Sequence, residues 1–182
     1  MAWLSGKEIN RQVEEGKIQI DPFNPKQTNP DSYDYRLGNV IRQLLPNSEW
    51  NGIPCIDPKK SMKYETFEIP ESGFLLVTEN AYLGHTVEKF GSKHFASLVT
   101  GKSSIGRLFI KNHACAGLID RGFFNHITLE ITAKLPTVIY PGMRFGQIFW
   151  FESRGDGEFY KGKYNEGDNI AQPSKIIEDW NK

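Results

Sequence analysis

Short apolar runs, separated by clusters of glycine, proline and asparagine, recur along the chain from Val40 onward. Runs of this kind bounded by turn residues are typical of strands. They predict strands at residues 40–45, 66–69, 73–77, 95–99, 108–110, 127–132, 138–140 and 145–151. A series of short strands accompanied by one early helix favours a mostly antiparallel β sandwich or barrel.

The first residues carry the signals of a helix start. Ser5 and Glu8 have the spacing of a capping box, and apolar residues flank them at the positions of a hydrophobic staple. We therefore expect a helix that begins at residue 6 and ends near Gly16. Residues 21–34 contain three prolines and many other turn formers, so we expect turns there.

Along residues 127–132, apolar residues alternate with Thr128, Glu130 and Thr132. A period of two places these three polar side chains on the same face of a strand. Carboxylates prefer water, so this face is either an ordinary solvated surface or the wall of a pocket. The sequence makes Glu130 a candidate reactive group without deciding between the two.

A second group of polar residues lies just upstream, in the run Gly101–Arg107. Two glycines frame two hydroxyls there, with a cation on each side. Backbone N–H groups and positive charge in such a loop can hold a phosphate chain. The run lacks the spacing of a P-loop, and an ordinary turn has a similar composition, so by itself it is a weak signal.

Length and charge indicate a single compact domain over residues 1–182, with a flexible C-terminal segment around 155–182. Basic and acidic residues number 22 each, which argues against a nucleic-acid partner because no overall basic field exists. The aromatic cluster at 145–151 is therefore interpreted as core and not as a base-stacking platform. No leader or membrane-spanning stretch is evident, so we expect a cytoplasmic protein without a membrane partner.

The chain has two cysteines, Cys55 and Cys115, and they form no paired framework. Nucleobase deaminases that use zinc need a His or Cys followed by a Cys-x-x-Cys pair, and the sequence has no such pair. If this chain deaminates a base, we expect it to do so without zinc.

Several separated motifs, in a fixed order, resemble those of the deoxycytidine triphosphate (dCTP) deaminases. These enzymes are relatives of the trimeric deoxyuridine triphosphatases (dUTPases). The resemblance covers nearly the whole chain, and several motifs in order are more specific than any one of them. The matching segments are 29–34, 37–38, 101–107, 113–123, 126–130, 141–143, 146–147 and 163–164.

The resemblance implies a dUTPase-like fold, a distorted jelly-roll or β-clip barrel with one N-terminal helix and few other short helices. It also implies a homotrimer whose sites are shared between subunits. The substrates would be deoxycytidine and deoxyuridine nucleotides, with Mg²⁺ as a cofactor held through their phosphates. The expected reaction is zinc-independent hydrolytic deamination of dCTP to dUTP or, with phosphate-chain cleavage, to dUMP, diphosphate and ammonia, for dTMP supply.

The resemblance also assigns roles. Glu130 would be the acid and base that moves the protons of the attacking water, since one carboxylate can do both in turn. Ser103 and Arg107 would hold that water and stabilise developing charge, and Asp120 would contact the sugar and position a second water for attack on the phosphates. The expected substrate-binding residues are Lys102, Ser104, Ile105, Gly106, Ala116, Gly117, Thr128, Leu129, Gln147, Tyr160 and Lys163.

The sequence departs from the family pattern at two places. Lys102 stands where relatives usually have arginine, which keeps the charge but loses the two-pronged geometry. In the tail, an acidic residue, Glu166, follows Lys163-Tyr164-Asn165 where relatives have glutamines. The motif around His113 is similar to the branch that forms dUMP, although a structural histidine would fit as well.

Two other functions remain open. One is a dUTPase or related nucleotide diphosphatase without deaminase activity, which Asp120 alone would allow. The other is a non-catalytic nucleotide-binding regulator, for which the altered Lys102 and tail are the only indications.

Overall fold

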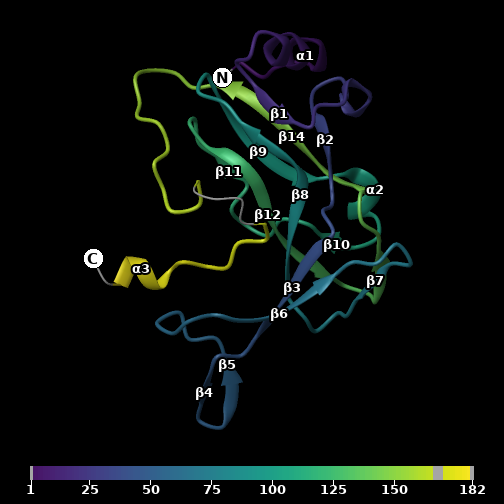
Figure 1. Cartoon of the computed structure of the whole chain (residues 1–182), viewed down its shortest axis with the longest axis vertical. Coiled ribbons are helices and arrows are strands. Elements are labelled where there is room, and N and C mark those ends of the chain that lie inside the picture. Colours follow the sequence, from purple (N-terminus) through teal and green to yellow (C-terminus); the bar gives the residue numbers. More distant parts are fainter. Residues whose placement is uncertain (1, 166–169, 181–182) are drawn as a thin grey trace.

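The chain folds around two β-sheets, seen in a computed structural model that describes residues 2–165 and 170–180 (Figure 1). The larger sheet has the strand order β10-β12-β8-β3-β6, and β1 pairs with β8 beside this path. Its strands are β1 (Gln19–Asp21), β3 (Val40–Leu45), β6 (Lys63–Glu68), β8 (Tyr82–Gly91), β10 (Ile110–Lys111) and β12 (Phe124–Ala133).

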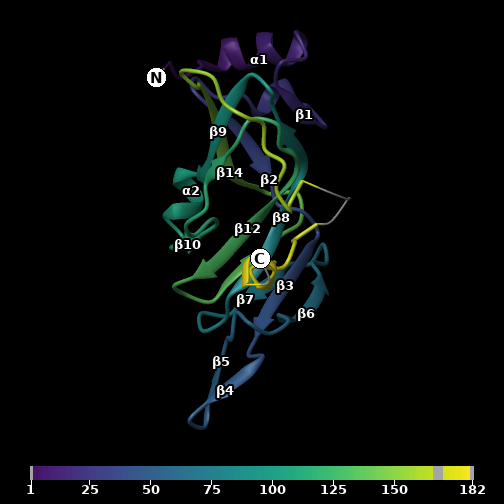
Figure 2. The same ribbon diagram turned by 90° about the vertical axis from the view of Figure 1, so that its left-hand side faces the viewer.

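The smaller sheet has the order β11-β9-β14-β2. Its strands are β2 (Tyr33–Arg36), β9 (Phe95–Gly101), β11 (Leu118–Ile119) and β14 (Arg144–Glu152). Two further pairs stand apart: β7 (Phe74–Leu76) with β13 (Thr137–Ile139), and β4 (Ser48–Trp50) with β5 (Ile53–Cys55). The β4–β5 hairpin extends from one end of the body in both views (Figures 1 and 2).

Large side chains from both sheets form one core. Tyr33, Tyr35, Phe90, Phe145 and Trp150 are all fully buried in it. The aromatic cluster of β14 therefore contributes two of the largest core residues, as the sequence indicated. The mostly β fold predicted from the pattern is confirmed, and so is the dUTPase-like class that the resemblance implied.

The predicted N-terminal helix is present as α1 (Gly6–Glu14). Ser5 caps it, with Oγ accepting a hydrogen bond from the backbone N–H of Glu8 at 3.4 Å. The chain leaves the helix through Gly16, whose φ of 71° lies in the left-handed region that favours glycine. The remaining helical segments are short: α2 (Ser103–Gly106), α3 (Ile177–Trp180) and the 3-10 turn η1 (Pro25–Gln27).

The predicted strands all have counterparts, but the pattern missed β8, the long central strand of the larger sheet, and also β1, β2, β4, β5 and β11. The hydropathy pattern does not indicate β8, because this strand buries polar side chains. Glu88 has no exposed surface and accepts hydrogen bonds from Arg36 Nε (2.7 Å) and Gln27 Nε2 (3.0 Å). A hydropathy pattern reads such a strand as polar, although its charge is paired inside the protein.

Two expectations for residues 101–110 were wrong in detail. The run from Ser103 to Gly106 is one turn of helix, α2, and not an irregular loop. The strand expected at 108–110 begins only at Ile110, because Phe109 adopts a left-handed φ of 55° and ends the α2 turn. Phe109 is 67% exposed and so does not add to the core.

The C-terminal segment crosses back over the larger sheet, and β12 is its main partner. Asn165 Oδ1 accepts from the backbone N–H of Phe124 (2.8 Å), and Gln172 N–H donates to Thr128 Oγ1 (2.9 Å). The substituted tail position Glu166 lies outside the described residues. No helix in the described residues 2–165 and 170–180 is long and apolar enough to cross a bilayer.

Candidate active site

A cavity of about 600 Å³ lies on the larger sheet beside the polar face of β12. The alternation predicted for this strand is confirmed, since Thr128, Glu130 and Thr132 are half-buried while their neighbours are buried. Its walls come from β12, the 113–120 loop, the region of β3 and β6, and the C-terminal segment. Residues that carry polar groups into it include Tyr64, His113, Asp120, His126, Thr128, Glu130, Tyr160, Tyr164, Gln172 and Ser174.

Glu130 is held in this cavity by one of its two carboxylate oxygens. Oε2 accepts hydrogen bonds from the backbone N–H groups of Ala114 (3.1 Å) and Cys115 (3.0 Å). The other oxygen, Oε1, makes no hydrogen bond to any residue within 2–165 or 170–180. The side chain is thus fixed in direction while one oxygen stays open to the cavity.

The thiol of Cys115 also contacts this carboxylate, with Sγ 3.6 Å from Glu130 Oε2. The neighbouring negative charge, together with that hydrogen bond, raises the pKa of the Cys115 thiol. The thiol therefore stays protonated and donates towards Glu130.

Of the predicted residues, Asp120, Ala116, Thr128 and Tyr160 line the same cavity as Glu130. The Asp120 side chain is exposed and makes no hydrogen bond within the described part of the chain. Tyr160 is placed by its backbone N–H, which donates to the carbonyl of Arg121 at 2.7 Å. These residues form the group that we call the pocket group: Ala116, Asp120, Thr128, Glu130 and Tyr160.

The other predicted catalytic residues lie elsewhere. Lys102, Ser103, Ser104, Gly106 and Arg107, which we call the α2 group, do not line the cavity. In Figure 1, α2 lies at the right of the molecule, whereas the C-terminal segment, which forms part of the cavity wall, lies at its left. One chain therefore does not bring the two groups together.

Lys102 has a partner of its own. Its Nζ lies 2.6 Å from Oδ2 of Asp34, a carboxylate with no exposed surface. Arg144 approaches the same oxygen at 3.5 Å, and Asn29 Nδ2 donates to Oδ1 at 2.7 Å. Arg107 is exposed, and the only hydrogen bond of its side chain among the described residues is from NH1 to the carbonyl of Ser103 at 3.0 Å.

Five other predicted substrate-binding residues are not among those that line the cavity. Ile105 is buried in the core at 4% exposure and Leu129 has no exposed surface. Gln147 Oε1 accepts from Ser32 Oγ at 3.2 Å. Lys163 Nζ is held by Asp179 (2.8 Å), which raises the pKa of that lysine. The backbone carbonyl of Gly117 accepts from Val99 N–H at 2.8 Å.

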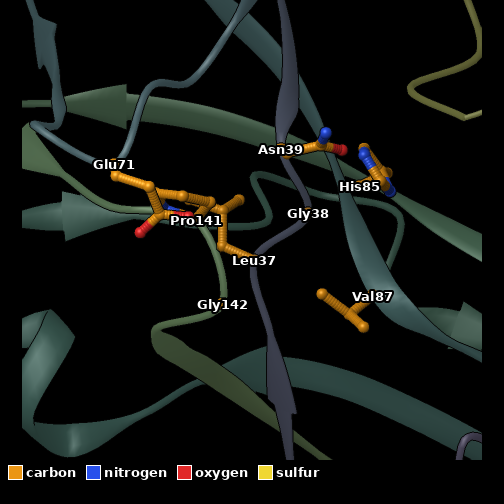
Figure 3. Close-up of a pocket in the computed structure, with 8 residues that line it drawn as sticks. All are labelled: Leu37, Gly38, Asn39, Glu71, His85, Val87, Pro141 and Gly142. Carbon is orange, nitrogen blue, oxygen red and sulfur yellow. The ribbon is translucent and has the colours of Figure 1, made fainter.

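A second cavity, of about 380 Å³, opens where the end of β2 meets the turn before β14 (Figure 3). It is lined by Leu37, Gly38, Asn39, Glu71, His85, Val87, Pro141 and Gly142. The polar group deepest in its wall, His85, is occupied: Nδ1 contacts the Thr86 carbonyl at 2.9 Å and Nε2 accepts from Val40 N–H at 3.4 Å. None of the predicted site residues faces this cavity.

The sequence did not indicate that Tyr64, Tyr164, His126 and Gln172 line the main cavity, or that the 114–115 amides hold Glu130. Tyr164 stands in a tail motif that was visible in the sequence, but no pattern shows that the tail returns to β12. Hydrogen bonds from backbone N–H groups cannot be recognised from the residue types in a sequence.

The fold is of the dUTPase-like type, and a solved structure with a similar fold supports this assignment. A crystal structure of the dCTP deaminase of Agrobacterium tumefaciens superposes with a TM-score of 0.64, at 21% identity, over 83% of this chain and 48% of that one. The sequence model of the dCTP deaminase-like family matches residues 3–153. The chain belongs to this family.

Relatives match along their whole length. A dCTP deaminase, dUMP-forming, from Clostridium acetobutylicum is 40% identical over 179 residues, which is 97% of this chain and 98% of the relative. A protein of the same name from Cytophaga hutchinsonii is 39% identical over 180 residues, which is 98% of this chain and 99% of the relative.

Proposed function

We propose that this protein hydrolyses the amine of dCTP without zinc and cleaves the phosphate chain, giving dUMP, ammonia and diphosphate. The observation that carries the proposal is the setting of Glu130, a carboxylate held by two backbone donors with one oxygen open to a nucleoside-sized cavity. The names of the relatives that match over the full chain support the same reaction.

The open oxygen of Glu130 is the group that moves protons in the proposed deamination. Glu130 Oε1 takes a proton from water as the water attacks the ring carbon that carries the amine. The same carboxyl gives that proton to the ring nitrogen. It then takes the second proton from the hydroxyl of the tetrahedral intermediate and passes it to the amine, which leaves as ammonia, as one carboxylate can act as base and then as acid. Oε2 stays fixed by the Ala114 and Cys115 amides, so the geometry is kept through both transfers.

Phosphate cleavage is proposed to use Asp120, whose carboxylate is exposed at the cavity and holds no described partner. Asp120 would contact the sugar and position the water that attacks the phosphate chain. Mg²⁺ takes oxygen ligands and keeps several waters when it binds nucleotides, so it would be held through the phosphates of the substrate. When bound, the ion would neutralise charge on the phosphates.

We further propose a homotrimer in which the α2 group of one subunit completes the pocket of its neighbour. Arg107 is exposed with no carboxylate partner in the described chain, and Ser103 lies beside it. These two residues have no reactive group to act on within their own subunit. Against the pocket group of a second copy they would meet the water and the substrate charge.

The reaction is tested by incubating the purified protein with dCTP or dUTP and Mg²⁺ while ammonia and diphosphate are followed separately. We expect dCTP to give one ammonia for each diphosphate. To test zinc independence, the protein is treated with EDTA and Mg²⁺ alone is restored; ammonia release should then persist. Diphosphate from dUTP without any ammonia from dCTP would show a diphosphatase instead. If neither ammonia nor diphosphate is released, the remaining candidate is a non-catalytic nucleotide-binding regulator.

Shared sites are tested by co-expressing two inactive chains, Glu130→Gln and Arg107→Ala, with different tags, and purifying the oligomers that carry both. In a trimeric ring that pairs each pocket with the neighbouring α2 group, every oligomer that carries both chains restores about one site in three. A site built within one chain restores none. The control is a mixture of two Glu130→Gln chains with different tags, which should stay inactive.

A further inference from the structure

Gln172 lies in the wall of the main cavity, although it belongs to none of the predicted site groups. The residue is 5% exposed. Its backbone N–H donates to Thr128 Oγ1 at 2.9 Å, and its side-chain Nε2 donates to the carbonyl of Tyr164 at 3.2 Å. Two anchors, one on the catalytic strand and one on the tail, therefore fix the position of its amide group.

The side-chain amide oxygen of Gln172, Oε1, has no hydrogen-bond partner in the described chain. Oε1 is buried and accepts no hydrogen bond from the described chain. The opposite orientation of the amide would place this oxygen against the Tyr164 carbonyl oxygen, so the hydrogen bond of Nε2 settles which atom is left over. Buried carbonyl oxygens are nearly always satisfied in folded proteins, so an exception calls for an explanation.

The location of the unpaired groups is informative. Four buried side-chain atoms lack a partner in the described residues, on Gln12, Arg42, His113 and Gln172. Two of these residues, His113 and Gln172, line the main cavity, where Glu130 is also found. Gln12 has the same unpaired amide oxygen but lies on α1, at the far end of the molecule from the cavity (Figure 1).

We propose that Gln172 is a nucleoside-binding residue, whose free Oε1 accepts a hydrogen bond from a donor on the bound deoxycytidine nucleotide. The proposal rests on the proposed function, and it names a contact within that site. Water does not reach this oxygen in the free chain. A small movement of the cavity wall on ligand entry would bring the donor to it and satisfy it.

A deoxycytidine nucleotide has two kinds of neutral donor, the exocyclic amine of the base and the 3′-hydroxyl of the sugar. The remaining oxygens and the ring nitrogen N3 only accept. A contact to the amine would favour cytosine over uracil, which has a carbonyl at that position. A contact to the hydroxyl would favour a 2′-deoxyribose over a dideoxyribose with no regard to the base.

The test measures calorimetric binding of dCTP, dUTP and 2′,3′-dideoxy-CTP to the full-length Glu130→Gln protein without Mg²⁺, so that neither deamination nor phosphate cleavage proceeds. Binding is compared with and without Gln172→Met, a change that keeps size and removes the acceptor. We expect dCTP to bind about tenfold more weakly. A loss for both cytosine ligands but not dUTP identifies the amine, and a loss for dCTP and dUTP but not the dideoxy ligand identifies the hydroxyl.

Equal losses for all three ligands, or no loss, would overturn the contact, because a displaced wall affects every ligand alike. Gln12→Met removes the matching unpaired amide on α1 and should leave all three affinities unchanged. A parent protein that binds none of the ligands overturns the proposed function together with the contact. A wild-type protein that binds dCTP but releases no ammonia overturns only the reaction.

Discussion

The regions around Asp34 and Glu130 use the same functional group in opposite ways. Asp34, on β2, has no exposed surface, and both its oxygens are occupied by Lys102, Arg144 and Asn29. Glu130, on β12, has one occupied oxygen and one that opens to a cavity. The saturated carboxylate is built to hold elements together, and the half-satisfied one is free to exchange a proton.

The comparison also separates the two cations of the α2 group. Lys102 is engaged by Asp34, which ties the start of α2 to β2. Arg107, one helical turn further on, is exposed and has no acidic partner in the described chain. Under the shared-site proposal, Arg107 is therefore the cation that is available to a neighbour, and Lys102 serves mainly to place it.

The largest expected effect is on the open carboxylate. Glu130→Gln should lower ammonia release from dCTP by about 10² to 10⁴-fold, since it removes the proton acceptor. The urea midpoint of unfolding should change little, because the two amide contacts can be kept by the remaining oxygen. Glu65→Gln, on an exposed site of β6, is the matched control. Near wild-type ammonia release by Glu130→Gln would rule out its role.

The next effect is on the saturated carboxylate. Asp34→Asn should lower the free energy of unfolding by about 2 to 3 kcal/mol, because it leaves two cations without their buried partner. The value stays below that of a fully enclosed pair, since the side chains of Lys102 and Arg144 are 27% and 48% exposed. Urea denaturation measures it, with the exposed Asp31→Asn as control. Unchanged stability would show that the network contributes nothing.

A smaller effect concerns the thiol beside Glu130. The carboxylate raises the pKa of Cys115, so less reactive thiolate is present near neutral pH. In a Cys55→Ala background, Glu130→Gln should speed alkylation of Cys115 by iodoacetamide severalfold at pH 7.5, followed by mass spectrometry. The gain should shrink towards high pH, where both forms are ionised. Glu65→Gln should alkylate at the parental rate, and an equal rate in Glu130→Gln would contradict the contact.

The smallest effect comes from His85, beside the second cavity. Burial lowers its pKa below the ordinary value of 6.5, so the unfolded chain takes up this proton more readily than the folded one. The contribution of His85 to stability is present above pH 6.5 and is lost as the pH falls below it. Urea unfolding across pH 7.5 to 5 should therefore show a shallower decline for His85→Gln. The exposed His94→Gln should keep the parental slope, and a parental slope in both variants would refute the assignment.

The sequence was informative where a single local signal decides the structure. The cap at Ser5 located α1, and the alternation around Glu130 located β12 and its polar face. It failed at β8, because Glu88 is a buried charge whose partner, Arg36, is far away in the chain. Pairing of that kind overrides hydropathy and leaves no local pattern.

The individual site residues could be predicted only through the family resemblance. Which of these residues come together in the folded chain could not be predicted. Glu130 and Asp120 meet at one cavity, whereas the residues of the α2 group do not line it. The role of Gln172 depends on where the tail crosses β12, which is decided by a hydrogen bond to Thr128 between segments 44 residues apart. Which groups meet across subunits stays a prediction.

The crossing of the tail over β12 has a consequence for synthesis of the protein. The cavity wall combines residues from Leu44 to Ile176, so it is incomplete until the segment around Ile176 has left the ribosome. A nascent chain can already form α1 and pair its early strands, but it offers no closed place for a nucleotide. Cellular nucleotide pools should therefore stabilise the finished protein and give no help to the chain while it is being made.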